Sequence, residues 1–142
     1  MKKTIKSITC VLLTFALIFC FASCTDTADK TALWENAKYV EDCEFGDGGT
    51  TVQVEVKAGK QSVTFTINTD KTVLGDALFE YDLISGEEGP YGLYIKSVNG
   101  ITADYDIDQS YWSFYKNGEY MTSGVDGAVI SDGEHYELVY TK

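Results

Sequence analysis

The sequence predicts an α+β domain in which one helix packs on a mixed or antiparallel sheet, with a β-grasp as the simplest topology. Two observations predict this class. Apolar and polar residues alternate in several short runs between positions 50 and 141, and one run with helical spacing follows the second of them. The order strand, strand, helix, then further strands is typical of one helix covering a sheet.

The first two runs predict a β-hairpin. Their strict alternation is the period-two pattern of half-buried strands, and residues 58–61 between them supply a turn. The alternating apolar residues are Val52, Val54 and Val56 in the first run and Val63, Phe65 and Ile67 in the second.

The helix is predicted from apolar residues three and four positions apart, at Leu74, Ala77, Leu78 and Tyr81. Asp70 or Thr72 is a suitable amino-terminal cap. Asp76 lies in the first turns, where the helix dipole favours an anion, so we expect a structural role for it in preference to a catalytic one. Residues 86–90 are predicted to end this unit in a loop.

The remaining strands are predicted at 93–98, 111–116, 119–122 and 134–141. Asn117-Gly118 is the strongest hairpin signal in the chain, because a type I′ turn needs positive φ at both central residues. Asp132-Gly133 marks another turn before the last strand. The Asn-Gly register pairs residues across its hairpin: Lys116 with Glu119, Tyr115 with Tyr120, and Phe114 with Met121.

The amino-terminal residues predict export. Lysines at positions 2, 3 and 6 precede the uncharged, mostly apolar segment 7–23, and small residues stand directly before Cys24. This arrangement resembles the lipobox of bacterial lipoproteins and implies lipidation of Cys24. The alternative, an uncleaved membrane anchor, would have only the short segment 7–23 with which to span a bilayer. We therefore expect an extracytoplasmic protein, lipid-anchored to the cell membrane.

The chain then divides into a signal peptide at 1–23, a tether and lead-in at 24–49, and the predicted α+β domain at 50–142. The lead-in lacks strong periodicity, and its apolar residues fit either one helical turn or a short strand. Once residues 1–23 are removed and Cys24 is modified, Cys43 is the one remaining thiol, which excludes an internal disulfide.

The charge and the motifs argue against nucleic-acid binding and against catalysis. The 22 acidic residues outnumber 11 basic ones, and the formal charge of −11 repels a phosphate backbone. The single histidine, His135, accompanies no nucleophile motif, and a zinc site built from His and Cys would have only His135 and Cys43. We expect no enzymatic activity, no required cofactor and no metal site.

Asp104, Asp106 and Asp108 recur at every second residue, a spacing at which carboxylates can chelate calcium. An EF-hand loop starting at Asp104 would need Gly and Glu where the chain has Gln109 and Tyr115, so that motif is excluded. A solvated acidic loop is the preferred interpretation, and an irregular calcium site is the alternative.

Aromatic residues gather between positions 91 and 120. Because neighbours in a strand point to opposite faces, Tyr111 and Tyr115 cannot share the face of Trp112 and Phe114. One set therefore belongs to the core and the other faces outward. An outward row of rings would suit a flat amphipathic ligand, and cross-strand pairing that only stabilises the sheet is the equal alternative.

Four short segments together resemble a known family. They are residues 92–100 (GLYIKSVNG), 111–114 (YWSF), 124–126 (GVD) and 131–134 (SDGE). They are similar to the carboxy-terminal β-domain of transcobalamin and intrinsic factor, and to bacterial lipoproteins with a transcobalamin-like domain. The resemblance spans roughly residues 50–141. It implies a β-grasp-like fold whose ligand-binding residues are Gly92, Tyr94, Ile95, Trp112 and Phe114.

The resemblance implies a bound cobalamin, another corrinoid or a similar amphipathic ligand. In the vertebrate proteins a large helical domain covers the other face of the corrin, and a half-site without it would bind more weakly unless a second binding subunit completes it. We therefore expect a membrane-anchored binding protein that hands its ligand to a transporter. The alternative is a cell-surface protein-interaction module that uses the aromatic hairpin or an edge strand.

Overall fold

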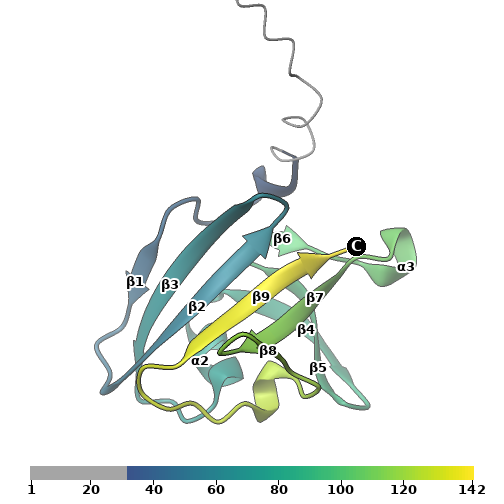
Figure 1. Ribbon diagram of the computed structural model, residues 1–142. Helices are drawn as coiled ribbons and strands as arrows, with labels where there is room; N and C mark the ends of the chain where they lie inside the picture. Colours follow the sequence, from purple (N-terminus) through teal and green to yellow (C-terminus); the bar gives the residue numbers. More distant parts are fainter. Residues whose placement is uncertain (1–31) are drawn as a thin grey trace, which may run out of the picture.

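The computed structural model describes residues 32–142, which form two β-sheets with short helices (Figure 1). The predicted signal peptide and Cys24 lie outside these residues. The larger sheet has the strand order β1-β3-β2-β9-β7-β8, and the smaller has the order β4-β5-β6. The strands are β1 (Cys43–Phe45), β2 (Thr50–Ala58), β3 (Gln61–Thr69), β4 (Ile84–Gly89), β5 (Gly92–Val98), β6 (Ile101–Thr102), β7 (Tyr111–Lys116), β8 (Glu119–Tyr120) and β9 (His135–Thr141).

The predicted hairpin of β2 and β3 is confirmed. The two strands are antiparallel, with Val54 opposite Phe65, and the alternating apolar side chains point into the core. Five of them have no exposed surface: Val52, Val54, Val56, Phe65 and Ile67. Each fully buried apolar side chain of this size contributes about 1.5–3 kcal/mol to the stability of the fold. This hairpin therefore supplies a large share of the hydrophobic core.

The last strand, β9, lies between β2 and β7 and pairs in parallel with β2 and antiparallel with β7 (Figure 1). The sheet is therefore mixed, which is one of the two forms that the sequence predicts. Tyr136 and Leu138 of β9 point into the core with no exposed surface. Glu137, between them, points to the outer face, where it is the direct cross-strand partner of Glu55.

The helix is also confirmed, as α2 (Leu74–Glu80), but its predicted cap is wrong. Neither Asp70 nor Thr72 caps it: Val73 is the cap residue and makes no side-chain bond. Instead the N–H of Leu74 donates to the carbonyl of Ala128, 2.9 Å away. A distant segment, next to the 3₁₀ helix η1 (Val125–Gly127), satisfies the free N–H group that a local cap would otherwise bind.

Residues 86–90 were predicted as a loop, and this prediction is wrong for most of them. They belong largely to β4, which pairs antiparallel with β5 and shifts register between Ser85 and Gly86. Most β4 side chains are exposed, so the strand carries no apolar alternation that a sequence pattern could detect. The α+β class fits the structure, whereas the β-grasp topology is not confirmed, because β4, β5 and β6 form a separate sheet.

The Asn117-Gly118 turn is confirmed. Both residues have positive φ, +49° and +82°, as a type I′ turn requires. Two of the predicted cross-strand pairs form, and the N–H of Met121 donates to the carbonyl of Phe114 at 2.9 Å. β8 ends at Tyr120, two residues earlier than predicted, because the chain leaves the sheet there toward η1.

The lead-in packs against both sheets. Trp34 is buried and its indole N–H donates to the carbonyl of Ala58 at 2.9 Å, while β1 pairs in parallel with β3. Asn99, in the turn between β5 and β6, exchanges two hydrogen bonds with the backbone of Tyr39. Across residues 32–142 no helix has the length and apolar character needed to cross a bilayer.

Candidate functional site

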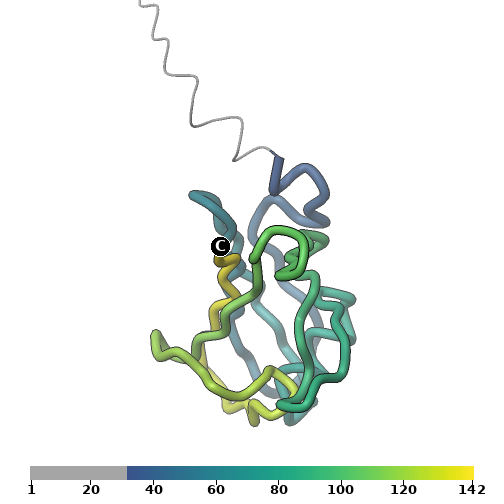
Figure 2. The backbone as a smooth tube through the Cα atoms, turned by 90° about the vertical axis from the view of Figure 1, so that its right-hand side faces the viewer, coloured from purple at the N-terminus to yellow at the C-terminus, as the bar shows by residue number. Residues whose placement is uncertain are grey.

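A cleft of about 230 Å³ opens between the two sheets. Residues 121–125, which follow β8, run from the larger sheet toward the turn between β4 and β5. This end of the molecule lies opposite the lead-in (Figure 2). The cleft is lined by residues 89–95, 112–114 and 120–125. All five residues that the resemblance implied, Gly92, Tyr94, Ile95, Trp112 and Phe114, are among them. The structure thus brings these five residues together, while their role in binding stays a prediction.

The floor of the cleft comes from β7. Trp112 and Phe114 are only 8% and 6% exposed, and they point to the core side of the larger sheet. Phe114 stacks on Tyr136 with ring centroids 5.8 Å apart, and Trp112 meets Tyr140 edge-on at 5.6 Å. The expected division of the aromatic residues is confirmed, since Tyr111 and Tyr115 lie on the opposite face and are half-buried.

One polar atom of this floor has no partner among the described residues. The Nε1–H of Trp112 is buried and makes no hydrogen bond. Leaving a buried donor unsatisfied costs about 1–3 kcal/mol, and such groups are rare in folded proteins. Trp112 lines the cleft, but its Nε1 has no accessible surface, so an acceptor of a ligand would reach this donor only after a shift of the indole ring or its neighbours.

The rim of the cleft depends on a glycine. Gly92 has a φ of +103°, a region that side chains rarely adopt, and a Cβ atom there would lie 2.8 Å from Oδ2 of Asp126. The absent side chain lets the turn between β4 and β5 approach η1. Tyr91, beside it, is 92% exposed at the mouth of the cleft.

A second hollow of about 450 Å³ adjoins the first, and Tyr94 lines both. Its other lining residues are Lys96, Tyr105, Asp106 and Tyr111. The ammonium group of Lys96 lies 5.0 Å from the centre of the Tyr94 ring, at a cation–π distance. Tyr94 therefore separates two neighbouring hollows, and the second combines three tyrosine rings with the charged side chains of Lys96 and Asp106.

The acidic run near α3 (Tyr105–Asp108) has structural bonds. Asp104 caps α3 by accepting from the N–H of Asp106 at 3.0 Å. Asp108 accepts from Ser110 and Lys142, and these bonds lower the pKa of its carboxyl group. The run therefore forms a capped, solvated turn, in line with the preferred interpretation.

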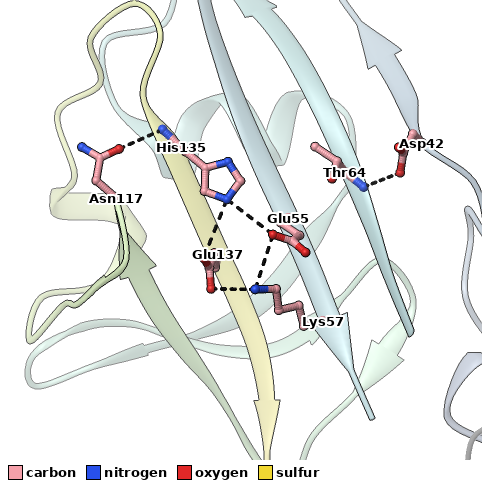
Figure 3. Close-up of polar contacts among 7 residues, drawn as sticks. All are labelled: Asp42, Glu55, Lys57, Thr64, Asn117, His135 and Glu137. Atoms are coloured by element: carbon pink, nitrogen blue, oxygen red, sulfur yellow. Dashed lines mark hydrogen bonds and ion pairs between the residues drawn. The ribbon is translucent and has the colours of Figure 1, made fainter. Parts of the chain in front are cut away.

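Potential metal ligands converge elsewhere in the described part of the chain. Glu55 of β2 and His135 and Glu137 of β9 bring three ligand atoms within 4.8 Å of one another on the outer face of the larger sheet (Figure 3). The sequence did not reveal this group, because Glu55 is about eighty positions from His135 and Glu137 and only the pairing of β2 with β9 brings them together. Lys57 binds both carboxylates, and its hydrogen bond with Glu137 raises the pKa of its ammonium group.

A second polar network supports the start of β9. The carboxylate of Glu134 accepts from the buried hydroxyl of Tyr136 and from Lys116, whose Nζ is 2.8 Å away. Burial raises the pKa of Glu134, but the bonds from Lys116 and Tyr136 outweigh it and lower the pKa. Burial also raises the pKa of Tyr136, so its hydroxyl remains a donor.

The fold resembles two solved structures. A candidate metal-binding protein from Ruminococcus gnavus superposes with a TM-score of 0.62 and 36% identity, over 66% of this chain and 97% of that one. Haptocorrin in complex with Cbi superposes with a TM-score of 0.50 and 24% identity, over 69% of this chain and 26% of that one. The similarity to haptocorrin concerns the fold alone. The structure is thus a small sheet-dominated α+β domain whose fold is similar to that of part of haptocorrin.

A family model described as Domain of unknown function (DUF4430) matches residues 70–142, just over half of the chain. The chain belongs to this family. It is also 27% identical over 81 residues to human transcobalamin-1, a match that covers 57% of this chain and 18% of that protein. The chain thus spans about a fifth of the length of transcobalamin-1 and about a quarter of the haptocorrin chain.

Proposed function

We propose that this protein is a non-catalytic binding protein whose cleft takes a cobalamin-like corrinoid or another flat, amphipathic ligand. The observation that supports this most strongly is the cleft itself, in which the rings of Trp112 and Phe114 lie across from the start of β5, which carries Gly92 and Tyr94. The unpartnered Nε1–H of Trp112, buried beside the cleft, would gain an acceptor if a bound ligand shifted the indole ring. A corrin ring offers both an apolar face and amide arms whose oxygens accept hydrogen bonds. The names of the relatives, transcobalamin-1 and haptocorrin, point to the same ligand class.

The size of the cleft indicates how such a ligand would lie. Pockets that enclose a small molecule usually measure about 300–1,000 Å³, and this cleft, at about 230 Å³, is smaller. One edge or arm of a corrinoid would enter it, and the rest would cross Tyr94 onto the neighbouring hollow. The other face would stay open for a second binding subunit or a transporter. A half-site of this kind binds more weakly than an enclosed pocket.

The proposal includes a location outside the cytoplasm. The pattern of residues 1–24 supports export and attachment of the chain to the membrane through a lipid on Cys24. A diacylated cysteine supplies the two chains that stable anchoring needs. From there the protein would pass its ligand to a transporter in the same membrane.

Calorimetric titration of the purified protein with cobalamin and with cobinamide tests the proposal, together with the visible spectrum of the corrinoid. We expect saturable heat and a spectral shift. The variant Trp112→Phe keeps an aromatic ring in the floor but removes the donor and part of the ring area, so it should weaken binding at least about two- to tenfold, the effect of one hydrogen bond. Tyr39→Phe, in the lead-in and outside both hollows, is the control and should leave affinity unchanged. No response at about 1 mM corrinoid, which corresponds to about 4 kcal/mol of binding, would refute it.

The outward aromatic hairpin supports a second candidate, a protein-interaction module. Tyr115 and Tyr120 pack edge-on with ring centroids 5.5 Å apart, and Tyr120 is 59% exposed at the edge of the larger sheet. Exposed aromatic rings at a sheet edge are typical docking surfaces for another chain. If this candidate is right, Tyr115→Ser should abolish crosslinking to a partner on cells, while Trp112→Phe should leave it intact.

A further inference from the structure

We propose that Glu55, His135 and Glu137 form a binding site for a divalent transition-metal ion, with Zn²⁺ as its representative. Nε2 of His135 lies 3.5 Å from Oε2 of Glu55 and 3.8 Å from Oε1 of Glu137 (Figure 3). Ligand atoms about 2.0–2.1 Å from a tetrahedral zinc ion are separated by roughly 3.3–3.5 Å. The two distances from His135 are within a few tenths of an ångström of these values, and all three ligand atoms lie within 4.8 Å of one another, so small side-chain rotations would let them coordinate one ion.

The backbone holds these ligands in register. Glu55 and Glu137 are direct partners in the parallel pair of β2 and β9, and His135 lies two residues before Glu137 on the same face. The opposite faces of both strands are buried in the core, so the strands give the ligands a rigid base. A site on rigid strands loses little conformational entropy when it binds an ion.

The charge of the site also favours a cation. Two carboxylates directly opposite each other in a sheet repel, and these side chains are only 22% and 20% exposed. Lys57 neutralises one of the two charges, with Nζ 3.0 Å from Oε2 of Glu137 and 3.4 Å from Oε2 of Glu55. A single ammonium group against two carboxylates leaves net negative charge on a protein that is already acidic.

The ammonium group of Lys57 takes part of the place that the metal ion would fill, and the ion would displace it. Its side chain is 37% exposed and its charge sits on a flexible four-carbon stem, so the ammonium group can move into solvent when a divalent ion enters. It binds Oε2 of Glu137, whereas Oε1 is the oxygen that faces His135. The metal and Lys57 therefore compete mainly for Glu55.

The ligand set selects the class of metal. One imidazole and two carboxylates suit zinc and its first-row neighbours, whereas Ca²⁺ prefers six to eight oxygen ligands. Three protein ligands leave a coordination position for water above the sheet. The site is separate from the cleft, because Trp112 and Phe114 point to the other face of the same sheet.

Calorimetric titration of the purified protein with Zn²⁺, and Co²⁺ absorption as a reporter of ligand type, test the inference. We expect one ion per chain and a cobalt spectrum without sulfur-to-metal charge transfer. His135→Gln and Glu137→Gln should each weaken zinc binding at least about tenfold, with Glu119→Gln, an exposed carboxylate elsewhere, as the unchanged control. Cys43→Ser should bind as the unsubstituted protein does.

Lys57→Gln makes the test independent of folding defects. Removing the competing ammonium group should tighten zinc binding by about two- to fivefold, the scale of a surface ion pair, and a variant that merely misfolds cannot gain affinity. Absence of zinc binding at about 1 mM would overturn the inference. So would full affinity in Glu137→Gln, or sulfur charge transfer that Cys43→Ser abolishes. Each outcome is separable from corrinoid binding, which the Trp112→Phe variant tests alone.

Discussion

Asn99 joins the lead-in to the smaller sheet, and its replacement by alanine is the sharpest test of the fold. Asn99 has no exposed surface. Its Nδ2 donates to the carbonyl of Tyr39 at 2.8 Å, and its Oδ1 accepts from the N–H of Tyr39 at 3.0 Å. Its φ is +52°, a conformation that asparagine tolerates better than alanine.

The magnitude follows from these contacts. Asn99→Ala removes two hydrogen bonds worth about 0.5–1.5 kcal/mol each and adds roughly 1 kcal/mol of left-handed strain. We therefore expect the free energy of unfolding to fall by about 2–4 kcal/mol. Asn99→Gly loses the same bonds, but glycine adopts the positive φ freely. Its free energy of unfolding should therefore fall by roughly 1 kcal/mol less than that of Asn99→Ala.

Urea unfolding followed by tryptophan fluorescence measures both variants, because Trp34 lies in the lead-in that Asn99 holds. Hydrogen exchange at Lys38 and Tyr39 locates the effect, since their N–H groups donate to Asn99. A loss below about 0.5 kcal/mol in Asn99→Ala would refute the role of the two bonds. Equal losses in the alanine and glycine variants would refute the strain contribution.

Two further predictions concern pH and the rim of the cleft. Glu134, with its pKa lowered below the ordinary 4.5, stabilises the folded state above that pH and loses this contribution as the pH falls through its folded value. Glu134→Gln should thus reduce the acid-induced fall in unfolding free energy, and an unchanged fall would contradict this. Gly92→Ala should cost about 1–3 kcal/mol in urea unfolding and weaken corrinoid binding, because its Cβ would meet Asp126. Gly133→Ala, with positive φ but open space, is the control and should cost less.

Local patterns were sufficient for much of the fold. The hairpin of β2 and β3, helix α2 and the Asn117-Gly118 turn were all predicted, because their signals lie within a few neighbouring residues. The alternation in β7 also predicted that Trp112 and Phe114 would separate from Tyr111 and Tyr115. Periodicity alone could not say which pair faces the core. The five cleft residues came from a family resemblance, which carries tertiary information that the pattern of one chain lacks.

Tertiary structure decided what depends on contacts between distant residues. The strand β4 is mostly exposed and pairs through its backbone, so its residues carry no apolar pattern. Helix α2 is capped by the carbonyl of Ala128, more than fifty positions away, and a search of neighbouring residues cannot find that partner. The parallel pairing of β2 with β9 likewise brings Glu55 beside His135 and Glu137. Sequence by itself thus determined the local elements and the acidic character of the chain. Strand pairing decided where the cleft and the carboxylate–histidine group lie, because the register of a strand is set by packing across the whole core.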